Sequence, residues 1–398
     1  MLWYNLFSTL LNQKEESLFY SQKRIVSLML VVLRVKEFPP FLWGIFISRQ
    51  ACLLLNMSLK AFLGIFLLFC TIAGQSQTLG GSSVYNFLKL PMGGQLAALG
   101  GKNVSHWSSD LSLISENPAL LKKQHHAFIS TTFNNVAPTV TALQGVGAFH
   151  HDKTNTSFSI GLLHLLYGEE MQTDASGNIL GSFRAYDQML SVSFAKSYGN
   201  RWRYGASLKY MHSSYGIYKS AGLAADVGLY YYDENRKLQI GFAARNMGAQ
   251  LKTYGGAAED LPFDLVIGVS KQLEKAPLRF SVTAQRVHQF DLLYNDTLYN
   301  NESFGSSERA GFVKKLFSHF VFGTELLLGD RLIVLAGYNV LRRNELSIKN
   351  IASGLTGFSY GLQLKLNRLN LYFSRSHYQS SLAQNQLTFS IRLITDQK

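Results

Sequence analysis

The chain of 398 residues carries a formal net charge of +13, with 16% charged and 13% aromatic residues. This charged fraction is low beside the roughly 25% of an ordinary soluble domain. The basic residues do not gather with aromatic ones as they do at nucleic-acid sites, so no nucleic-acid partner is expected. Both cysteines, Cys52 and Cys70, lie near the beginning, which excludes a disulfide framework for the rest of the chain.

Residues 1–56 contain two short apolar runs, Ile25 to Leu33 and Phe41 to Ile47, separated by charged residues and two prolines. Neither run approaches the about 20 apolar residues that a membrane-spanning helix needs. We therefore interpret residues 1–56 as upstream sequence translated before the true start. The alternative is a genuine N-terminal anchor.

Residues 57–76 have the pattern of a secretory signal peptide. Met57 is followed by the basic Lys60, an apolar stretch from Ala61 to Ala73, and small residues that end at Ser76. Cleavage there leaves Gln77 as the first residue of an exported protein. The mature chain would contain no cysteine, and no cofactor is expected.

The stretch from Val84 to Leu121 reads as an N-terminal arm. Its aromatic and apolar opening is followed by a run of small residues that allows close backbone approach, which is typical of a segment threaded through a confined space. Near its end, Asn117 can cap a short helical turn that Pro118 opens. We assign residues 77–125 to an arm or plug and residues 126–398 to the domain that follows.

This stretch resembles the opening of the PorQ family, outer-membrane components of the type IX secretion system of Bacteroidetes, and more loosely the FadL-type transporters. Two departures from the family pattern stand out: Gln95 replaces a usual arginine, and Ser108-Ser109 replaces an acidic pair. The matching residues are Tyr85, Asn86, Phe87, Leu88, Pro91, Ala97, Ala98, Leu99, Gly100, Gly101, Asp110, Asn117, Pro118, Ala119 and Leu120.

A later segment also resembles a loop of this family. It carries Asp174 and Gly177, followed by Gly181, Phe183 and Asp187. The spacing of Asp174, Ser176 and Asn178 leaves calcium binding open, but the bidentate glutamate of a calcium loop is missing. A turn is the preferred interpretation.

From residue 126 onward, apolar and polar residues alternate with the period of β-strands, as in Leu190 to Phe194 and Leu387 to Leu393. Fourteen segments have this pattern, an even number as single-chain bacterial barrels require. They are 126–135, 139–150, 154–166, 186–198, 202–216, 220–233, 237–250, 263–274, 278–291, 319–329, 332–343, 354–366, 369–380 and 385–395.

An exported chain of alternating strands without a long apolar helix predicts an all-β fold, a transmembrane antiparallel β-barrel of about 14 strands. Val192, Phe280, Leu364 and Phe389 are expected to face lipid, and their neighbours Ser193, Ser281, Lys365 and Ser390 the interior. The inward set also holds Arg245, Arg279 and Arg392, which a water-filled lumen would tolerate. A soluble β-sandwich is the alternative.

The connections alternate between short turns and longer loops. The long ones are Tyr167 to Ala185, Leu251 to Pro262, Leu292 to Ser318 and Asn344 to Ser353. This asymmetry is typical of outer-membrane barrels and predicts that both barrel termini lie in the periplasm.

No catalytic or metal constellation is found. His125-His126 and His150-His151 are adjacent pairs whose side chains would point to opposite faces, which is poor metal geometry. No Gly-x-Ser-x-Gly motif occurs, and Gly145-Val146-Gly147 lacks the third glycine of a dinucleotide site.

The resemblance implies a non-enzymatic component of the type IX system that anchors the cell-surface attachment complex in the outer membrane. Its implied partners are PorV, the sortase PorU and the surface protein PorZ, besides outer-membrane lipid and lipopolysaccharide. The alternative is a FadL-like transporter of hydrophobic compounds. An outer-membrane enzyme such as a phospholipase is the third class.

The signal peptide gives a first prediction. N-terminal sequencing of the protein extracted from membranes should begin at Gln77, because signal peptidase recognises the small residues before it. A chain mutated at Met57 should not be exported, whereas a chain that starts at Met57 should be. Any peptide from residues 1–56 in the mature protein would contradict the assignment.

Overall fold

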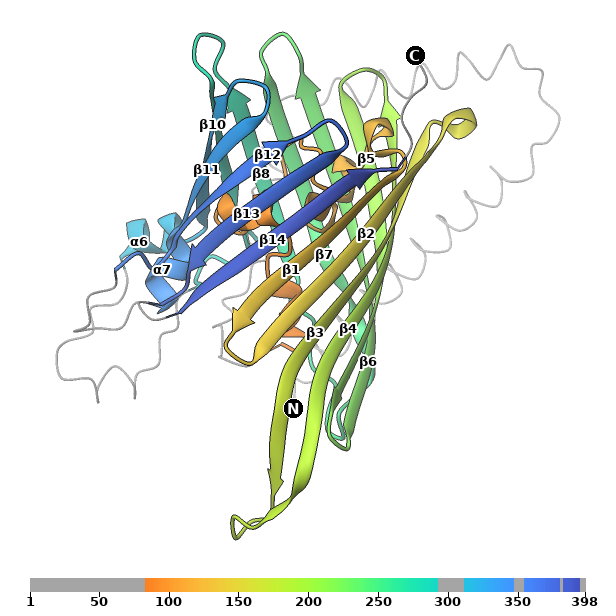
Figure 1. The fold of residues 1–398 in the computed structure, drawn as a ribbon, viewed down its shortest axis with the longest axis vertical. Helices are drawn as coiled ribbons and strands as arrows, with labels where there is room; N and C mark the ends of the chain where they lie inside the picture. Colours follow the sequence, from red (N-terminus) through yellow and green to blue (C-terminus); the bar gives the residue numbers. More distant parts are fainter. Residues whose placement is uncertain (1–82, 293–310, 347–353, 380–381, 394–398) are drawn as a thin grey trace, which may run out of the picture. The chain divides into compact units, whose positions relative to one another are not determined.

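The computed structural model describes residues 83–292, 311–346, 354–379 and 382–393. The predictions for residues 1–56 and 57–76 lie outside this part and stay predictions. Within it, fourteen antiparallel strands form a closed barrel in which β1 pairs with β14 (Figure 1). The predicted fold class and strand number are therefore confirmed.

Each strand hydrogen-bonds to its neighbours in the sequence, so the barrel is an up-and-down meander closed by the register Phe128↔Arg392. The strands are β1 Phe128–Ala137, β2 Val140–His151, β3 Thr156–Thr173, β4 Ile179–Tyr198, β5 Trp202–Tyr215, β6 Tyr218–Asp233, β7 Leu238–Lys252, β8 Asp264–Gln272, β9 Leu278–Ala284, β10 Phe320–Leu328, β11 Leu332–Asn339, β12 Phe358–Lys365, β13 Leu369–His377 and β14 Ala383–Arg392.

The two ends of the barrel differ in their connections. The short-turn end holds the turns β2/β3, β4/β5, β6/β7, β8/β9, β10/β11 and β12/β13, together with the start of β1 and the end of β14. The opposite end, here the long-loop end, holds the connection 253–263 and the helices α6 Phe312–Phe317 and α7 Val340–Leu346. Most of the predicted loop Leu292 to Ser318 lies outside the described residues.

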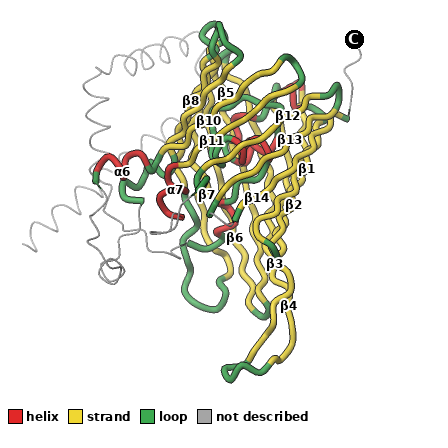
Figure 2. Tube along the Cα trace, turned by 60° about the vertical axis from the view of Figure 1, so that its left-hand side comes forward, coloured by secondary structure: helices red, strands yellow, loops and turns green. Residues whose placement is uncertain are grey.

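Three segments differ from the prediction at the long-loop end. The expected loop Tyr167 to Ala185 is mostly strand, because β3 and β4 stay paired beyond a bulge between Leu166 and Glu169 and turn only at 174–178. Figures 1 and 2 show this hairpin extending past its neighbours. β9 ends at Ala284 rather than 291, and the segment after Asn339 is the helix α7 rather than the end of β11.

The outer face is apolar, as the alternation predicted. Val192, Phe280 and Leu364 are 49%, 43% and 38% exposed, and they belong to a belt that also includes Ile160 and Leu208. A closed barrel satisfies every ladder hydrogen bond within the sheet, and an apolar outer belt is what a bilayer solvates. The fold is thus that of an outer-membrane β-barrel. Among the described residues, no helix is long and apolar enough to cross a membrane.

The interior is packed, so the inward side chains do not line a water-filled channel. Ser193, Ser281 and Ser390 are 4%, 7% and 0% exposed. They are covered because the segment before β1 fills the lumen, as the short helices inside the barrel in Figure 2 show. A charged side chain introduced at these serines would therefore be buried, at a cost unless it found a partner. Lys365 remains half-buried.

The outer belt gives a second prediction. Val192→Arg should destabilise the barrel by up to about 2–4 kcal/mol, because a guanidinium would replace an isopropyl group on the lipid-facing surface. Urea unfolding of the barrel in lipid vesicles measures the change, with Val192→Leu as the apolar control. Lys365→Arg, which keeps a charge on the inner face, should cost far less. Equal losses for Val192→Arg and Lys365→Arg would contradict the assignment of the two faces.

Candidate functional site

Residues 83–125, here the lumenal plug, run through the barrel from one end to the other. At the long-loop end, the Val84 nitrogen donates to the Asp260 carbonyl at 3.0 Å. At the short-turn end, Lys123 Nζ lies 2.6 Å from Asp152 Oδ1 in the β2/β3 turn. The chain then enters β1. The plug consequently begins at the end opposite to the one where the two barrel termini meet.

The opening of the plug packs on an apolar part of the inner wall. η1 Asn86–Lys89 and its neighbours place Tyr85, Phe87 and Leu88 in one core cluster with the wall. The wall contributes four inward side chains that would be unexpected in a wet lumen: Leu163, Leu165, Met189 and Met211. The aromatic opening of the family motif therefore covers an apolar patch that would otherwise face water.

The small residues of the motif allow the plug to touch the wall with its backbone. Ala97 and Ala98 end the short helix α4 Gly94–Ala98, and Leu99, Gly100 and Gly101 follow it. The matching glycines of the wall could not be predicted from the plug. A Cβ on Gly337 would lie 2.2 Å from the Gly100 nitrogen, and one on Gly241 would lie 1.9 Å from the Val104 carbonyl oxygen. Both strands have room for the plug only because these residues lack side chains.

The second half of the motif supplies caps. Asp110 precedes η2 Leu111–Ser115, and its Oδ1 accepts from the Ser112 nitrogen at 2.9 Å. Asn117 caps η3 Pro118–Leu120 as predicted, accepting from the Ala119 nitrogen at 3.0 Å. Its amide also donates to the carbonyls of Val104 and Leu229, at 2.8 and 3.1 Å. Asn117 therefore joins two parts of the plug to strand β6.

Buried ion pairs join the plug to the wall. Glu116 Oε2 lies 2.7 Å from Arg245 Nη1 on β7 and 3.4 Å from Lys102 Nζ, and Lys102 also reaches Asp264 Oδ2 at 3.3 Å. Glu116 and Arg245 are each 2% exposed. Arg245 was expected to face water in the lumen, but it is buried and paired. Removing one partner of such a pair leaves an uncompensated charge, at a cost of about 3–5 kcal/mol.

A second buried cluster contains the departures from the family pattern. Ser108 Oγ donates to Gln95 Oε1, while Gln95 Nε2 donates to Glu325 Oε1 at 3.0 Å. Glu325 also pairs with Arg279 Nη1 at 2.7 Å. Gln95 and Ser108, both neutral, thus hydrogen-bond to each other inside the barrel. Arg279, also predicted to face inward, is neutralised by a wall carboxylate.

The residues from Asp174 to Asp187, the later segment of the resemblance, lie in two different parts of the barrel. Asp174 and Gly177 form the tip of the β3/β4 hairpin, where Asp174 Oδ1 accepts from the nitrogens of Ser176 and Asn178. The predicted turn is thus present. Gly181 and Phe183 lie on β4 within the extended hairpin. Asp187, further along β4, is buried inside the barrel, and the cavity that it lines is also lined by Tyr85, Asn86 and Phe87 of the plug.

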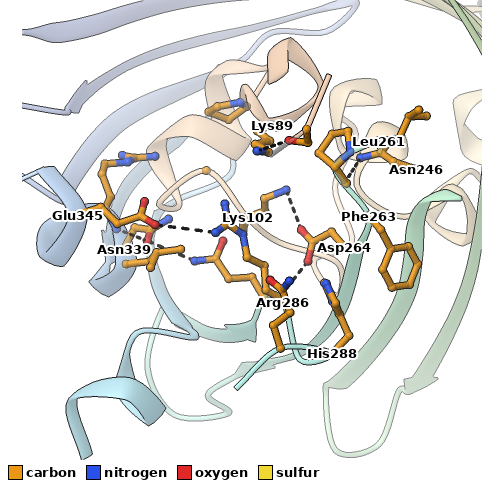
Figure 3. A pocket seen from close by; sticks show the side chains of 18 of the residues that line it. Lys89, Lys102, Asn246, Leu261, Phe263, Asp264, Arg286, His288, Asn339 and Glu345 are labelled. Atoms are coloured by element: carbon orange, nitrogen blue, oxygen red, sulfur yellow. Dashed lines mark hydrogen bonds and ion pairs between the residues drawn. The ribbon is translucent and has the colours of Figure 1, made fainter. Parts of the chain in front are cut away.

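Two cavities open at the long-loop end, and Ser83 lines both. The larger, of about 800 Å³, is the charged cavity (Figure 3). Its lining includes four cationic side chains, Lys89, Lys102, Arg286 and Arg342, and three carboxylates, Asp260, Asp264 and Glu345. Pro91 of the motif also lines it. Arg286 and Glu345 approach to 3.8 Å across it, while Lys89 donates to Asn86 Oδ1 at 2.6 Å.

The smaller cavity, of about 430 Å³, is the tyrosine cavity. It is lined by Phe87, Asp187, Glu259 and five tyrosines, namely Tyr85, Tyr167, Tyr215, Tyr218 and Tyr254. These residues come from the plug, four strands and the connection 253–263. Sequence reasoning selected Tyr85 and Asp187 separately but gave no sign that they meet. Their juxtaposition depends on the path of the plug.

In the described part of the chain, no group of three or more His, Cys, Asp or Glu residues is placed to hold a metal ion. Adjacent His125 and His126 have separate partners: His125 Nε2 contacts the Ser108 carbonyl at 2.9 Å, and His126 Nδ1 accepts from the His150 nitrogen at 3.1 Å.

No family model and no curated protein matches the sequence. Solved structures do resemble the fold. A deletion mutant of the TodX monoaromatic hydrocarbon channel superposes with a TM-score of 0.45 at 15% identity, covering 76% of this chain and 98% of that one. The CymD monoaromatic hydrocarbon channel gives 0.43 at 12%, covering 77% and 97%. A Pseudomonas aeruginosa FadL homologue gives 0.42 at 10%, covering 75% and 97%. Because these TM-scores and identities are low, the similar structures do not establish the function, which has to be argued from the residues of this chain.

The buried histidines of the plug give a third prediction. Burial, with Lys122 nearby, lowers the pKa of His125 from 6.5 to about 3. Burial and Arg279 likewise hold the pKa of His106 well below its usual value. Between pH 6.5 and about 3, the unfolded chain binds a proton at His125 that the folded chain does not. Stability of the docked plug should therefore fall as pH drops through this window.

Limited proteolysis of the plug at pH 7.5 and pH 5 measures this dependence. His125→Gln keeps a donor for the Ser108 carbonyl and should weaken the pH dependence, and combination with His106→Gln should weaken it further. His151→Gln removes an exposed histidine, whose side chain is not buried in the lumen, and is the control. The same dependence in the double variant as in the wild type would contradict the assignment.

Proposed function

We propose that this protein is a non-enzymatic outer-membrane barrel, sealed by its own N-terminal segment, that serves as a surface scaffold of the type IX secretion system. The observation that supports the scaffold function is that the plug is anchored along its whole length. Ion pairs at Glu116, hydrogen bonds at Asn117 and backbone contact at Gly100 all hold it to the wall. Opening the lumen would expose all of these groups at once.

The charged cavity supports the same proposal. A site for hydrophobic solutes is lined mainly by apolar and aromatic side chains. This cavity instead has Lys102, Asp264 and Arg286 on its surface, and desolvating them against an apolar solute would carry a large cost. A scaffold has no such requirement and can present polar groups at its long-loop end.

The type IX assignment comes from the resemblance of the plug motif to the PorQ family. Its implied partners, PorV, PorU and PorZ, are part of the proposal. The contacts give the motif residues roles in docking the plug: the aromatic opening covers the apolar wall, the small residues admit close approach, and Asp110 and Asn117 cap turns. We propose that the long-loop end, where loops and the extended hairpin gather, holds the attachment complex.

A FadL-like conduit for hydrophobic compounds is the second candidate, and one feature of the lumen favours it. The opening of the plug covers the apolar wall patch around Leu163 and Met211, beside both cavities. If this part moved, an apolar chamber would open at the long-loop end. Two of the three similar structures described above are channels by name, and the third is a FadL homologue. None of the three names refers to secretion.

A disulfide that locks the plug gives the fourth prediction and separates the two functions. A Cβ on Gly323 would lie 3.4 Å from the Leu99 Cβ, close to the about 3.5–4.5 Å between the Cβ atoms of a disulfide. It would also lie 2.5 Å from Ser281 Oγ, so every variant of this experiment carries Ser281→Ala as well. Leu99→Cys with Gly323→Cys should therefore cross-link plug and wall in a mature chain that has no other cysteine. In a deletion strain, this locked variant should retain PorZ-like and PorU-like proteins at the cell surface as the wild type does.

The deletion strain that carries no copy of the gene should release those proteins into the medium. The two single-cysteine variants are the controls for the substitutions themselves. A conduit gives the opposite result: the deletion strain keeps its surface proteins but loses uptake of a hydrophobic nutrient, and the oxidised variant regains that uptake only after reduction. That outcome would contradict the scaffold function and support the transporter.

A further inference from the structure

The tyrosine cavity combines aromatic walls with negative charge. Asp187 is 2% exposed, and three hydroxyl groups donate to it: Tyr167 at 2.5 Å, Tyr215 at 2.8 Å, and Ser213. Hydroxyl groups satisfy the carboxylate oxygens but bring no positive charge. Among the described residues, no Lys, Arg or His nitrogen lies within 4.0 Å of this carboxylate. A buried charge without a countercharge is costly and therefore attracts a cation.

A second carboxylate lines the same cavity and has no cationic partner in the described part of the chain either. Glu259 lies on the connection 253–263 and is exposed, and its backbone nitrogen is fixed by Gln250 Oε1 at 3.0 Å. No lysine, arginine or histidine is among the residues that line the cavity. The neighbouring charged cavity, in contrast, has four cations against three carboxylates. The carboxylates of the tyrosine cavity therefore lack the countercharges that the charged cavity provides within its own lining.

The rings that surround the carboxylates stand at large angles to one another. Tyr167 and Tyr215 lie 5.6 Å apart between centroids at 48°, and Tyr215 and Tyr254 lie 5.7 Å apart at 69°. Tyr85 and Phe87 of the plug add two more rings, 6.1 Å apart at 74°. Aromatic faces attract cations, and a quaternary ammonium group suits them because it is large and weakly hydrated.

We propose that the tyrosine cavity is a binding site for a small organic ammonium ion, with Asp187 and Glu259 as countercharges and the tyrosine rings as walls. Its volume of about 430 Å³ is within the range of small-molecule sites, about 300–1,000 Å³. A bare metal ion fits less well, because the Asp187 oxygens already accept from three hydroxyls. The chemistry of the cavity is the same whether the barrel serves as a scaffold or a conduit.

Titration calorimetry of the detergent-solubilised full-length protein with choline tests this site. Choline should bind, whereas 3,3-dimethylbutan-1-ol, the neutral molecule of the same shape, should bind at least about tenfold more weakly. Tyr218→Leu should weaken choline binding by about two- to fivefold, the loss expected for one exposed cation–π contact. Tyr218 is 55% exposed, so this change should leave the barrel folded. Glu259→Gln and Asp187→Asn should weaken binding as well, the latter most.

Control variants lie on β3 and β4, two strands that line the cavity, but outside the cavity itself. Tyr198→Leu removes an exposed tyrosine from the other end of β4, and Glu170→Gln removes an exposed carboxylate from the β3 extension. Both should bind choline like the wild type. Three results would each overturn the site: no choline binding tighter than about 10 mM, equal binding of choline and the alcohol, or unchanged affinity in both Tyr218→Leu and Glu259→Gln. If Asp187→Asn fails to fold, the other two variants decide.

Discussion

The pairing of buried charges between plug and wall is the interaction on which the rest of this structure depends. A barrel of fourteen strands encloses more space than its own inward side chains can fill, since about eight strands already give an interior just wide enough for them. Arg245 and Arg279 point into that space. Arg279 is paired with Glu325 of the wall, but Arg245 is paired with Glu116, which belongs to the plug. Without the plug, the Arg245 guanidinium would lose this countercharge.

Close backbone contact is the second constraint, and it links residues far apart in the sequence. The plug can lie against the sheet because glycines such as Gly241 and Gly337 are placed where it passes. Small residues in the plug therefore lie directly against small residues in the wall. A side chain at either position would push the plug away and break the ion pairs beyond it, so packing and electrostatics support each other.

These constraints leave the long-loop end as the part of the interior that is open. The plug tip around Ser83 lines both cavities, one with mixed charges and one with tyrosines and two carboxylates. Both the proposed scaffold and the alternative conduit would act there, since the rest of the lumen is occupied. The extended β3/β4 hairpin stands at the same end, and its paired strands make it a firmer projection than a loop of the same length.

The sequence alone determined the closed antiparallel barrel, its fourteen strands and which residues of each strand face outward, because strand alternation is local and the lipid-facing set must be apolar at every other position. It also identified the cap at Asn117, which acts within two residues. Only the tertiary structure decided which groups hold the plug inside the lumen. The pairs Glu116–Arg245, Gly100–Gly337 and Tyr85 with Asp187 join positions more than a hundred residues apart, and no local pattern encodes such meetings. The sequence therefore placed Arg245 and Arg279 in water, whereas the fold places each of them beside a carboxylate.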